Sequence, residues 1–320
     1  MKQRLHLPIF VGLLLAGCSF FAVQFAPTKQ ASSPRSDAAI QADELFWKIL
    51  HAGEYGRIPD ALSASTAAYL ENPGDSVTAS HIGFLHIWRL AERSRLGGVP
   101  ATITDHAVLA RRYFKESVQL NPSDARVLGF LGAALLAEGT IHKDEKLKRR
   151  GYYSLLDAIR EWPEFNYFTA GYVMSGEPAD STRFKEALEW QWQTLDECAQ
   201  EKVNRQGPDY SRYMHLETKK GRKRVCWNSW IAPHNFEGFF LNMGDMLAKS
   251  GDWPTAQRIY ANARLSPDYA KWRLRAVLEQ RIMDAPENVS RFNATEDPSG
   301  EVVSRIMFSS RFACMACHQE

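Results

Sequence analysis

A small residue recurs at a nearly fixed distance before a proline in four stretches of the chain. The intervals are Ala61 to Pro73, Ala110 to Pro122, Gly151 to Pro163 and Ala256 to Pro267. A second small residue follows the first by seven positions in each stretch, at Ala68, Ser117, Ala158 and Ala263. Positions seven apart lie on one helix face, where small side chains let two helices approach, and proline stops a helix. The pattern predicts an all-α chain of repeated helix pairs.

This pattern resembles the tetratricopeptide repeat, a unit of two antiparallel helices with small residues where they cross. Glycines follow two of the prolines by ten positions, at Gly83 and Gly132. The clearest copy spans residues 240–267 and places Gly244 twelve positions before Ala256. The resemblance implies a tetratricopeptide-like solenoid over residues 39–285, whose groove would dock a partner protein or peptide. A generic irregular helical domain is the alternative.

The N-terminus carries the parts of a secretory signal. Lys2 and Arg4 precede an apolar stretch that is short for a membrane span. Leu15-Ala16-Gly17-Cys18 follows and resembles the lipobox of bacterial lipoproteins. The resemblance implies a signal peptide over residues 1–17, a lipid on Cys18 and a flexible linker to residue 38. We therefore expect a lipid-anchored protein of the cell envelope, facing the periplasm or the cell surface. Ser19 favours the outer membrane. An ordinary cleaved signal or an N-terminal membrane helix is the alternative.

Charge excludes one class of partner. Removal of Lys2 and Arg4 with the signal lowers the Lys plus Arg count from 39 to 37, which equals the 37 Asp plus Glu residues. A protein that binds nucleic acid as its main partner usually has a basic excess. We expect partners to be proteins or the membrane instead.

Export also constrains the five cysteines, because free thiols are unusual in an oxidising compartment. Cys18 takes lipid, and Cys314 with Cys317 belongs to a C-terminal motif. The remaining Cys198 and Cys226 are predicted to form a disulfide worth about 3 kcal/mol by chain entropy. Two independent buried thiols are the alternative.

The segment from Ser211 to Trp227 departs from the helical pattern. It predicts a β-hairpin, within an insertion over residues 204–230, that turns around Lys219-Lys220-Gly221-Arg222. Five of the six residues from Lys219 to Arg224 are basic. Such a tip would dock onto an acidic partner or anionic lipid headgroups, or would be a solvated turn.

The chain ends close to Cys314-Met315-Ala316-Cys317-His318, which matches the C-x-x-C-H motif for covalent haem attachment. Two thiols form thioethers with the haem vinyl groups, and the histidine binds the iron axially. Residues three and four apart share a helix face, so we predict a haem c helix after a linker within residues 286–320. A disulfide on a frayed tail, a thiol-exchange pair and a zinc site are the alternatives.

The motif's position excludes a downstream methionine ligand, because two residues follow His318. Arg311-Phe312-Ala313-Cys314 resembles the opening of the C-terminal motif in class II cytochromes, locally over about ten residues. A second axial ligand would come from upstream. His234, amid aromatic residues, is the candidate for a distal ligand or haem-pocket residue, and a structural histidine is the alternative. His81, His86 and His215 are weaker candidates.

These features favour a membrane-anchored monohaem c-type cytochrome that transfers electrons and docks its redox partner on the repeats. We find no recognisable acid–base pair, nucleotide loop or nucleophile triad, so an electron carrier is preferred over an enzyme. A five-coordinate haem that binds a small gas is a variant of this hypothesis. The alternative is a haem-free interaction or assembly lipoprotein with a disulfide or thiol-exchange tail.

Overall fold

The computed structural model describes residues 21–227, 236–294 and 305–318, and within these ranges the chain is helical and contains no strand. The α-helices are α2 (Asp37–Ala52), α3 (Ile58–Glu71), α4 (Ser76–Ala91), α5 (Asp105–Leu120), α6 (Ala125–Ile141), α7 (Glu145–Glu161), α8 (Pro163–Met174), α9 (Thr182–Ala199), α10 (Phe236–Lys249), α11 (Trp253–Asn262), α12 (Arg275–Met283) and α13 (Ala285–Asn293). None of the helices in these ranges combines the length and the apolar character needed to cross a membrane. Cys18 and His234 lie outside the described residues.

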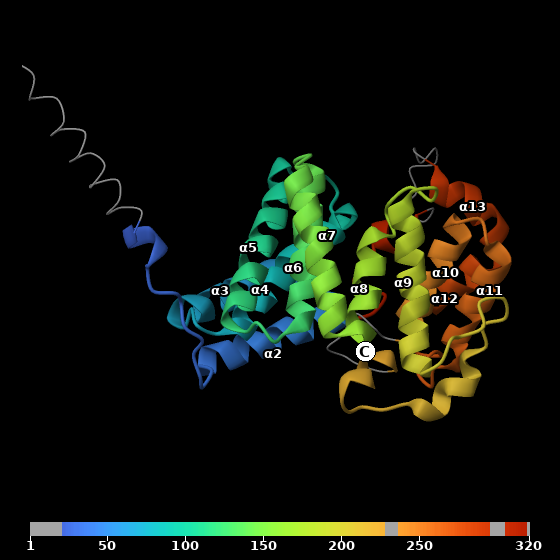
Figure 1. Cartoon of the computed structure of the whole chain (residues 1–320), viewed down its shortest axis with the longest axis horizontal. Helices are drawn as coiled ribbons and strands as arrows, with labels where there is room; N and C mark the ends of the chain where they lie inside the picture. The colour runs from blue at the N-terminus through green and yellow to red at the C-terminus, as the bar shows by residue number, and fades with distance from the viewer. Residues whose placement is uncertain (1–20, 228–235, 295–304, 319–320) are drawn as a thin grey trace, which may run out of the picture.

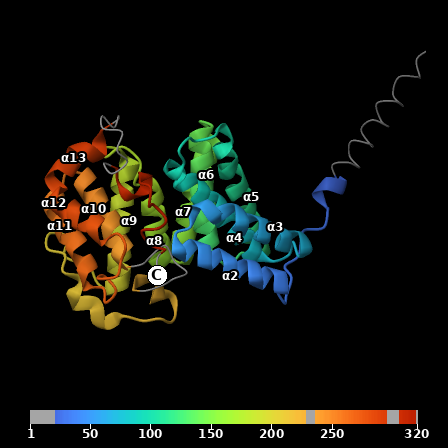
Figure 2. The same ribbon diagram turned by 180° about the vertical axis from the view of Figure 1, so that it is seen from behind.

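The helices pack as consecutive pairs, α2 with α3, α4 with α5, α6 with α7, α8 with α9 and α10 with α11. Figure 1 shows two groups of helices, α2–α7 and α8–α13, with the C-terminal end of the chain between them. The view from behind in Figure 2 shows the same arrangement. The predicted all-α class is therefore confirmed, and the groups meet where α8 packs on α6 and α7.

Helix starts follow from capping side chains. Asp75, Asp124 and Asp144 precede α4, α6 and α7, and each carboxylate accepts a hydrogen bond from a backbone N–H of the first turn. Pro163 occupies the first turn of α8, where a missing N–H costs nothing.

The small residues of the sequence pattern lie buried where the paired helices cross. They are Ala61, Ala68, Ala110, Ser117, Gly151, Ala158, Ala256 and Ala263. Gly244 shows how tight the approach is, because a Cβ built there would lie 2.2 Å from the ring of Tyr260. A Cβ at Gly83 would lie 2.7 Å from the ring of Phe114. An aromatic ring of one helix thus occupies the space that a glycine leaves on its partner.

The predicted β-hairpin is wrong. Its residues form two 3₁₀ helices, η4 (Tyr210–Leu216) and η5 (Arg222–Cys226). Tyr210 and Tyr213 are three positions apart, which is the 3₁₀ repeat, and both are buried, with ring centres 5.1 Å apart. Strand alternation would direct these two rings to opposite faces, so their shared burial favours the helical turn.

The basic residues of this segment are partly held against the helices. Arg222 pairs with Glu164 of α8, with Nε 3.3 Å from the carboxylate oxygen, and donates to the Glu161 carbonyl. Arg224 lies over the ring of Trp162. Lys219 and Lys220 remain exposed.

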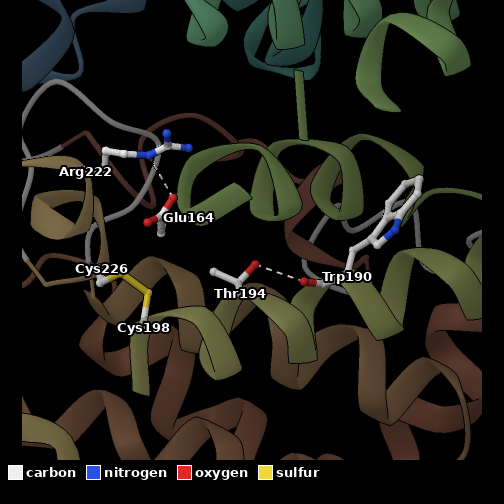
Figure 3. Close-up of a disulfide and its surroundings, with 6 residues drawn as sticks. All are labelled: Glu164, Trp190, Thr194, Cys198, Arg222 and Cys226. Carbon is white, nitrogen blue, oxygen red and sulfur yellow. Dashed lines mark hydrogen bonds and ion pairs between the residues drawn. A yellow bond between two sulfur atoms is a disulfide. The ribbon is translucent and has the colours of Figure 1, made fainter. Parts of the chain in front are cut away.

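Cys198 at the end of α9 and Cys226 at the end of η5 form a disulfide, with their Cα atoms 5.7 Å apart. This is the pairing that the cysteine count predicts. Figure 3 shows the disulfide beside the Arg222–Glu164 ion pair. Two links therefore hold the irregular segment, one to α9 and one to α8.

Two expectations near the C-terminus also change. Much of the expected linker after residue 285 is the helix α13, which begins with Pro286 in its first turn and buries Phe292. The predicted C-terminal haem helix is wrong as a regular element, because residues 311–317 form turns after a short 3₁₀ helix at Met307–Ser309. This segment is fixed by contacts with distant helices rather than by the repeated backbone hydrogen bonds of a regular helix.

Candidate functional site

The C-terminal segment, residues 305–318, passes between the two helix groups (Figures 1 and 2). Its last part is one irregular turn, in which Ala316 N–H donates to the Phe312 carbonyl at 2.8 Å. The N–H groups of Cys317 and His318 both donate to the Cys314 carbonyl at 3.2 Å. This turn achieves locally what the expected helix would have done, because Cys314, Cys317 and His318 line the same cavity.

Glu92, directly after α4, holds the start of the turn. Its Oε1 accepts hydrogen bonds from the N–H of Cys314 at 2.7 Å and of Met315 at 3.0 Å. Its Oε2 lies 2.6 Å from Nε of Arg95. Burial raises the pKa of Glu92, while Arg95 and the two N–H donors oppose that shift. The fully buried carboxylate therefore acts as a cap for a turn more than 200 residues away.

Asp245 of α10 holds the other end of the segment. Its Oδ2 accepts a hydrogen bond from the Met307 N–H at 2.7 Å, and its Oδ1 accepts one from the Tyr260 hydroxyl at 2.6 Å. Arg281 lies beside the same carboxylate, with Nε 3.4 Å from Oδ1. The start of the segment is thus fixed to the α8–α13 group.

Apolar packing joins the segment to both groups. Met315 is buried in a cluster with Phe46 and Trp88 of the α2–α7 group. Trp272, between α11 and α12, donates from Nε1 to the Ala316 carbonyl at 3.3 Å. The segment therefore bridges the groups, and the motif has a defined place in the fold.

The cavity next to the motif has a volume of about 940 Å³, within the range typical of ligand sites. Its walls are mostly apolar and include several aromatic side chains, among them Trp47, Phe84, Phe130, Phe165, Phe168, Tyr172 and Phe308. Arginines also line it, namely Arg93, Arg126, Arg183 and Arg305. The cavity thus combines flat apolar walls with donors for anionic groups.

His318 has the properties of a metal ligand. Its Nδ1 is buried and makes no hydrogen bond, which is unusual for a polar atom inside a protein. Burial, with His51 nearby, lowers the pKa of His318 to about 3, so the imidazole is neutral at physiological pH. Neutral imidazole is the form that binds metal ions.

The two motif cysteines remain thiols, so the expected alternative of a Cys314–Cys317 disulfide is not what the structure shows. Burial raises the pKa of the Cys314 thiol, and the Glu92 carboxylate raises it further. For the zinc alternative, the described ranges hold no group of three or more His, Cys, Asp or Glu residues able to bind a metal ion.

The other histidine candidates are distributed across the molecule. His81 lines the same cavity, with Nδ1 2.6 Å from Asp43 and its ring stacked on Phe46. His86 and His106 face each other, with their Nδ1 atoms 2.8 Å apart. His215 is exposed on η4. Within the described residues, none of these three histidine rings is in ring contact with His318.

His51 is the site residue that sequence reasoning missed. It lies near the end of α2, is buried, and its ring centre is 6.4 Å from that of His318. The only local signal was its position four residues after Trp47, which places both rings on one helix face. Comparison with protein-family models, curated proteins and solved structures finds no significant match to this chain.

Proposed function

We propose that this protein is a monohaem c-type cytochrome in which Cys314 and Cys317 bind haem through thioethers and His318 binds the iron. The observation that carries the proposal is that both thiols and this imidazole line one aromatic cavity between the two helix groups. Haem c bound there would supply one-electron oxidation and reduction at iron.

The surrounding residues fit such a group. The aromatic side chains in the walls suit a flat apolar macrocycle. Arg183 and Arg305 offer charged donors for its carboxylate groups. Glu92 and Asp245 hold the segment at both ends, so the motif is positioned by the fold rather than displayed on a loose tail.

The scaffold is proposed to be tetratricopeptide-like and to dock a redox partner protein. Support comes from the five helix pairs and from the small residues buried at their crossings. The lipobox resemblance at Cys18 adds a lipid anchor in the cell envelope, facing the periplasm, with the outer membrane favoured by Ser19. Together these features describe an anchored electron carrier rather than an enzyme.

The test is expression in a host with a cytochrome c maturation system, followed by a spectrum of the denatured protein. We expect a haem band that stays with the polypeptide and is lost in the variant with Cys314→Ala and Cys317→Ala. Cys198→Ser with Cys226→Ser is the matched control, because it removes two cysteines away from the cavity. Colourless wild-type protein would instead support a haem-free interaction or assembly lipoprotein.

A further inference from the structure

We propose that His51 is the second axial ligand of the iron that His318 binds. The inference rests on the proposed function and adds to it a ligand, a coordination number and a spin state. The ring centres of His51 and His318 lie 6.4 Å apart, with the ring planes inclined at 54°, although the two residues are 267 positions apart in the sequence.

This separation suits a shared metal ion. An imidazole nitrogen binds a metal at about 2.0–2.1 Å, so two rings on opposite sides of one ion have centres roughly 6 Å apart. The observed 6.4 Å between ring centres agrees with this value. Two imidazoles in direct mutual hydrogen bonding are closer, as in the His86–His106 pair with ring centres 5.0 Å apart.

The end of α2 is shaped to bring His51 against the motif. Gly53 ends the helix at φ +67°, and a Cβ there would lie only 3.1 Å from Sδ of Met315. Arg273 donates to the Ala52 carbonyl at 3.2 Å and holds the same helix end. These contacts fix the end of α2 against Met315, one of the two residues between the motif cysteines.

The ring of His51 is itself oriented by packing. The Trp47 ring stacks on it with centres 5.5 Å apart, and the side chain is buried, so solvent has little access to it. A ligand held in place before the metal arrives loses little entropy on binding. Trp47 also lines the cavity, so the His51 ring stacks on a residue of the cavity wall.

Two imidazole ligands give a six-coordinate iron with no open position. The protein would then be an electron carrier and not a sensor of small gases. This separates it from the five-coordinate arrangement that the class II cytochrome resemblance allows.

The experiment compares covalently loaded wild type with His51→Ala and with His81→Ala. His81 is the matched control because it lines the same cavity and lies on the neighbouring helix α4. Absorption and electron paramagnetic resonance spectra report the spin state, and the denatured spectrum reports the haem content of each variant. We expect low-spin wild type and low-spin His81→Ala, but high-spin His51→Ala with the same haem content.

Two further measurements guard against a variant that is merely misfolded. Added imidazole should return His51→Ala to a low-spin spectrum, since it replaces the missing ring. His51→Met should stay low-spin with a higher potential, because a methionine ligand raises the potential of haem iron.

The outcomes distinguish the two proposals. Wild type without covalent haem overturns the proposed function. Covalent haem with an unchanged low-spin spectrum in His51→Ala overturns the His51 assignment alone. Loss of the low-spin state in His234→Ala or His81→Ala but not in His51→Ala would assign the ligand to another histidine and likewise overturn it.

Discussion

At the scale of single residues, buried charge organises the site. Glu92 is completely buried, yet its two oxygens receive donors from the C-terminal turn and from Arg95. The buried carboxylate of Asp245 likewise accepts from the Met307 N–H at the start of the segment and lies beside Arg281. A buried carboxylate that loses its partners is strongly unfavourable, so these two residues fix the path of the segment as well as stabilise it.

Glu92→Ala should lower the free energy of unfolding by about 3 kcal/mol, because it leaves the N–H groups of Cys314 and Met315 without their acceptor and removes the ion pair with Arg95. Urea unfolding measures the loss, and trypsin should cleave faster after Arg305 and Arg311. Glu54→Ala, which removes an exposed ion pair with Arg57, is the control and should change little. Equal stability of Glu92→Ala and wild type would contradict the role of this carboxylate.

His86 gives the protein a predicted pH dependence. Burial and the facing His106 lower the pKa of His86 from 6.5 to about 4. Between these values the unfolded state binds more protons than the folded state, so stability falls as pH falls from about 6.5 toward 4. The contribution at the acid end is roughly 3 kcal/mol.

Urea titrations of wild type and His86→Phe at neutral pH and at about pH 4 check this sign. The variant should lose less stability than wild type on acidification. His215→Phe, at an exposed position, should behave as wild type. An identical acid loss in His86→Phe and wild type would show that His86 does not contribute.

At the scale of helices, small residues and rings set the spacing of each pair. Gly244 and Tyr260 are the clearest case, since they come from α10 and α11 and leave no room for a methyl group. The hydroxyl of Tyr260 also reaches Asp245, so the same ring links helix packing to the C-terminal segment. Changes at the crossing are therefore expected to affect the site.

Gly244→Ala should destabilise the protein by roughly 2–3 kcal/mol, because the new methyl group overlaps the Tyr260 ring. Gly56→Ala is the control, since no atom lies within 4 Å of the added Cβ there. Its effect should stay within about 0.5 kcal/mol. Thermal or urea unfolding measures both, and a neutral Gly244→Ala would mean that α10 and α11 separate easily.

At the scale of the whole molecule, the C-terminal segment connects two groups of helices (Figure 1). Met315 packs into the first group, and the Trp272 side chain binds the Ala316 carbonyl from the second. Phe308 contacts Tyr172 of α8 with ring centres 5.3 Å apart, and both line the cavity. The segment therefore holds the two helix groups together and also carries the candidate cofactor site.

A chain that stops after residue 304 should therefore unfold at a lower urea concentration and bind a hydrophobic dye at the uncovered cavity. Burial of a methionine side chain contributes about 1.5–3 kcal/mol, so Met315→Ala should reproduce part of the loss. An unchanged unfolding midpoint in the truncated chain would contradict the bridging role.

The sequence by itself determined the features that depend on local spacing. Small residues seven apart predicted the helix pairs, cysteine parity predicted the Cys198–Cys226 disulfide, and the C-x-x-C-H spacing located two thiols and an imidazole within one turn. The error over residues 211–227 arose because a basic, turn-rich segment carries little local preference, and side-chain packing selected 3₁₀ helices instead of strands.

Only the tertiary structure decided what faces the motif. Glu92 carries no local signal for its role, and the spacing of His51 from Trp47 does not point to His318, because the residues that Glu92 and His51 meet lie more than 200 positions away. The turn at Cys314–His318 is likewise held by Glu92 from outside, so its shape does not follow from helix propensity. Long-range packing thus brings His51 opposite His318, and this juxtaposition gives the C-terminal motif its proposed second ligand.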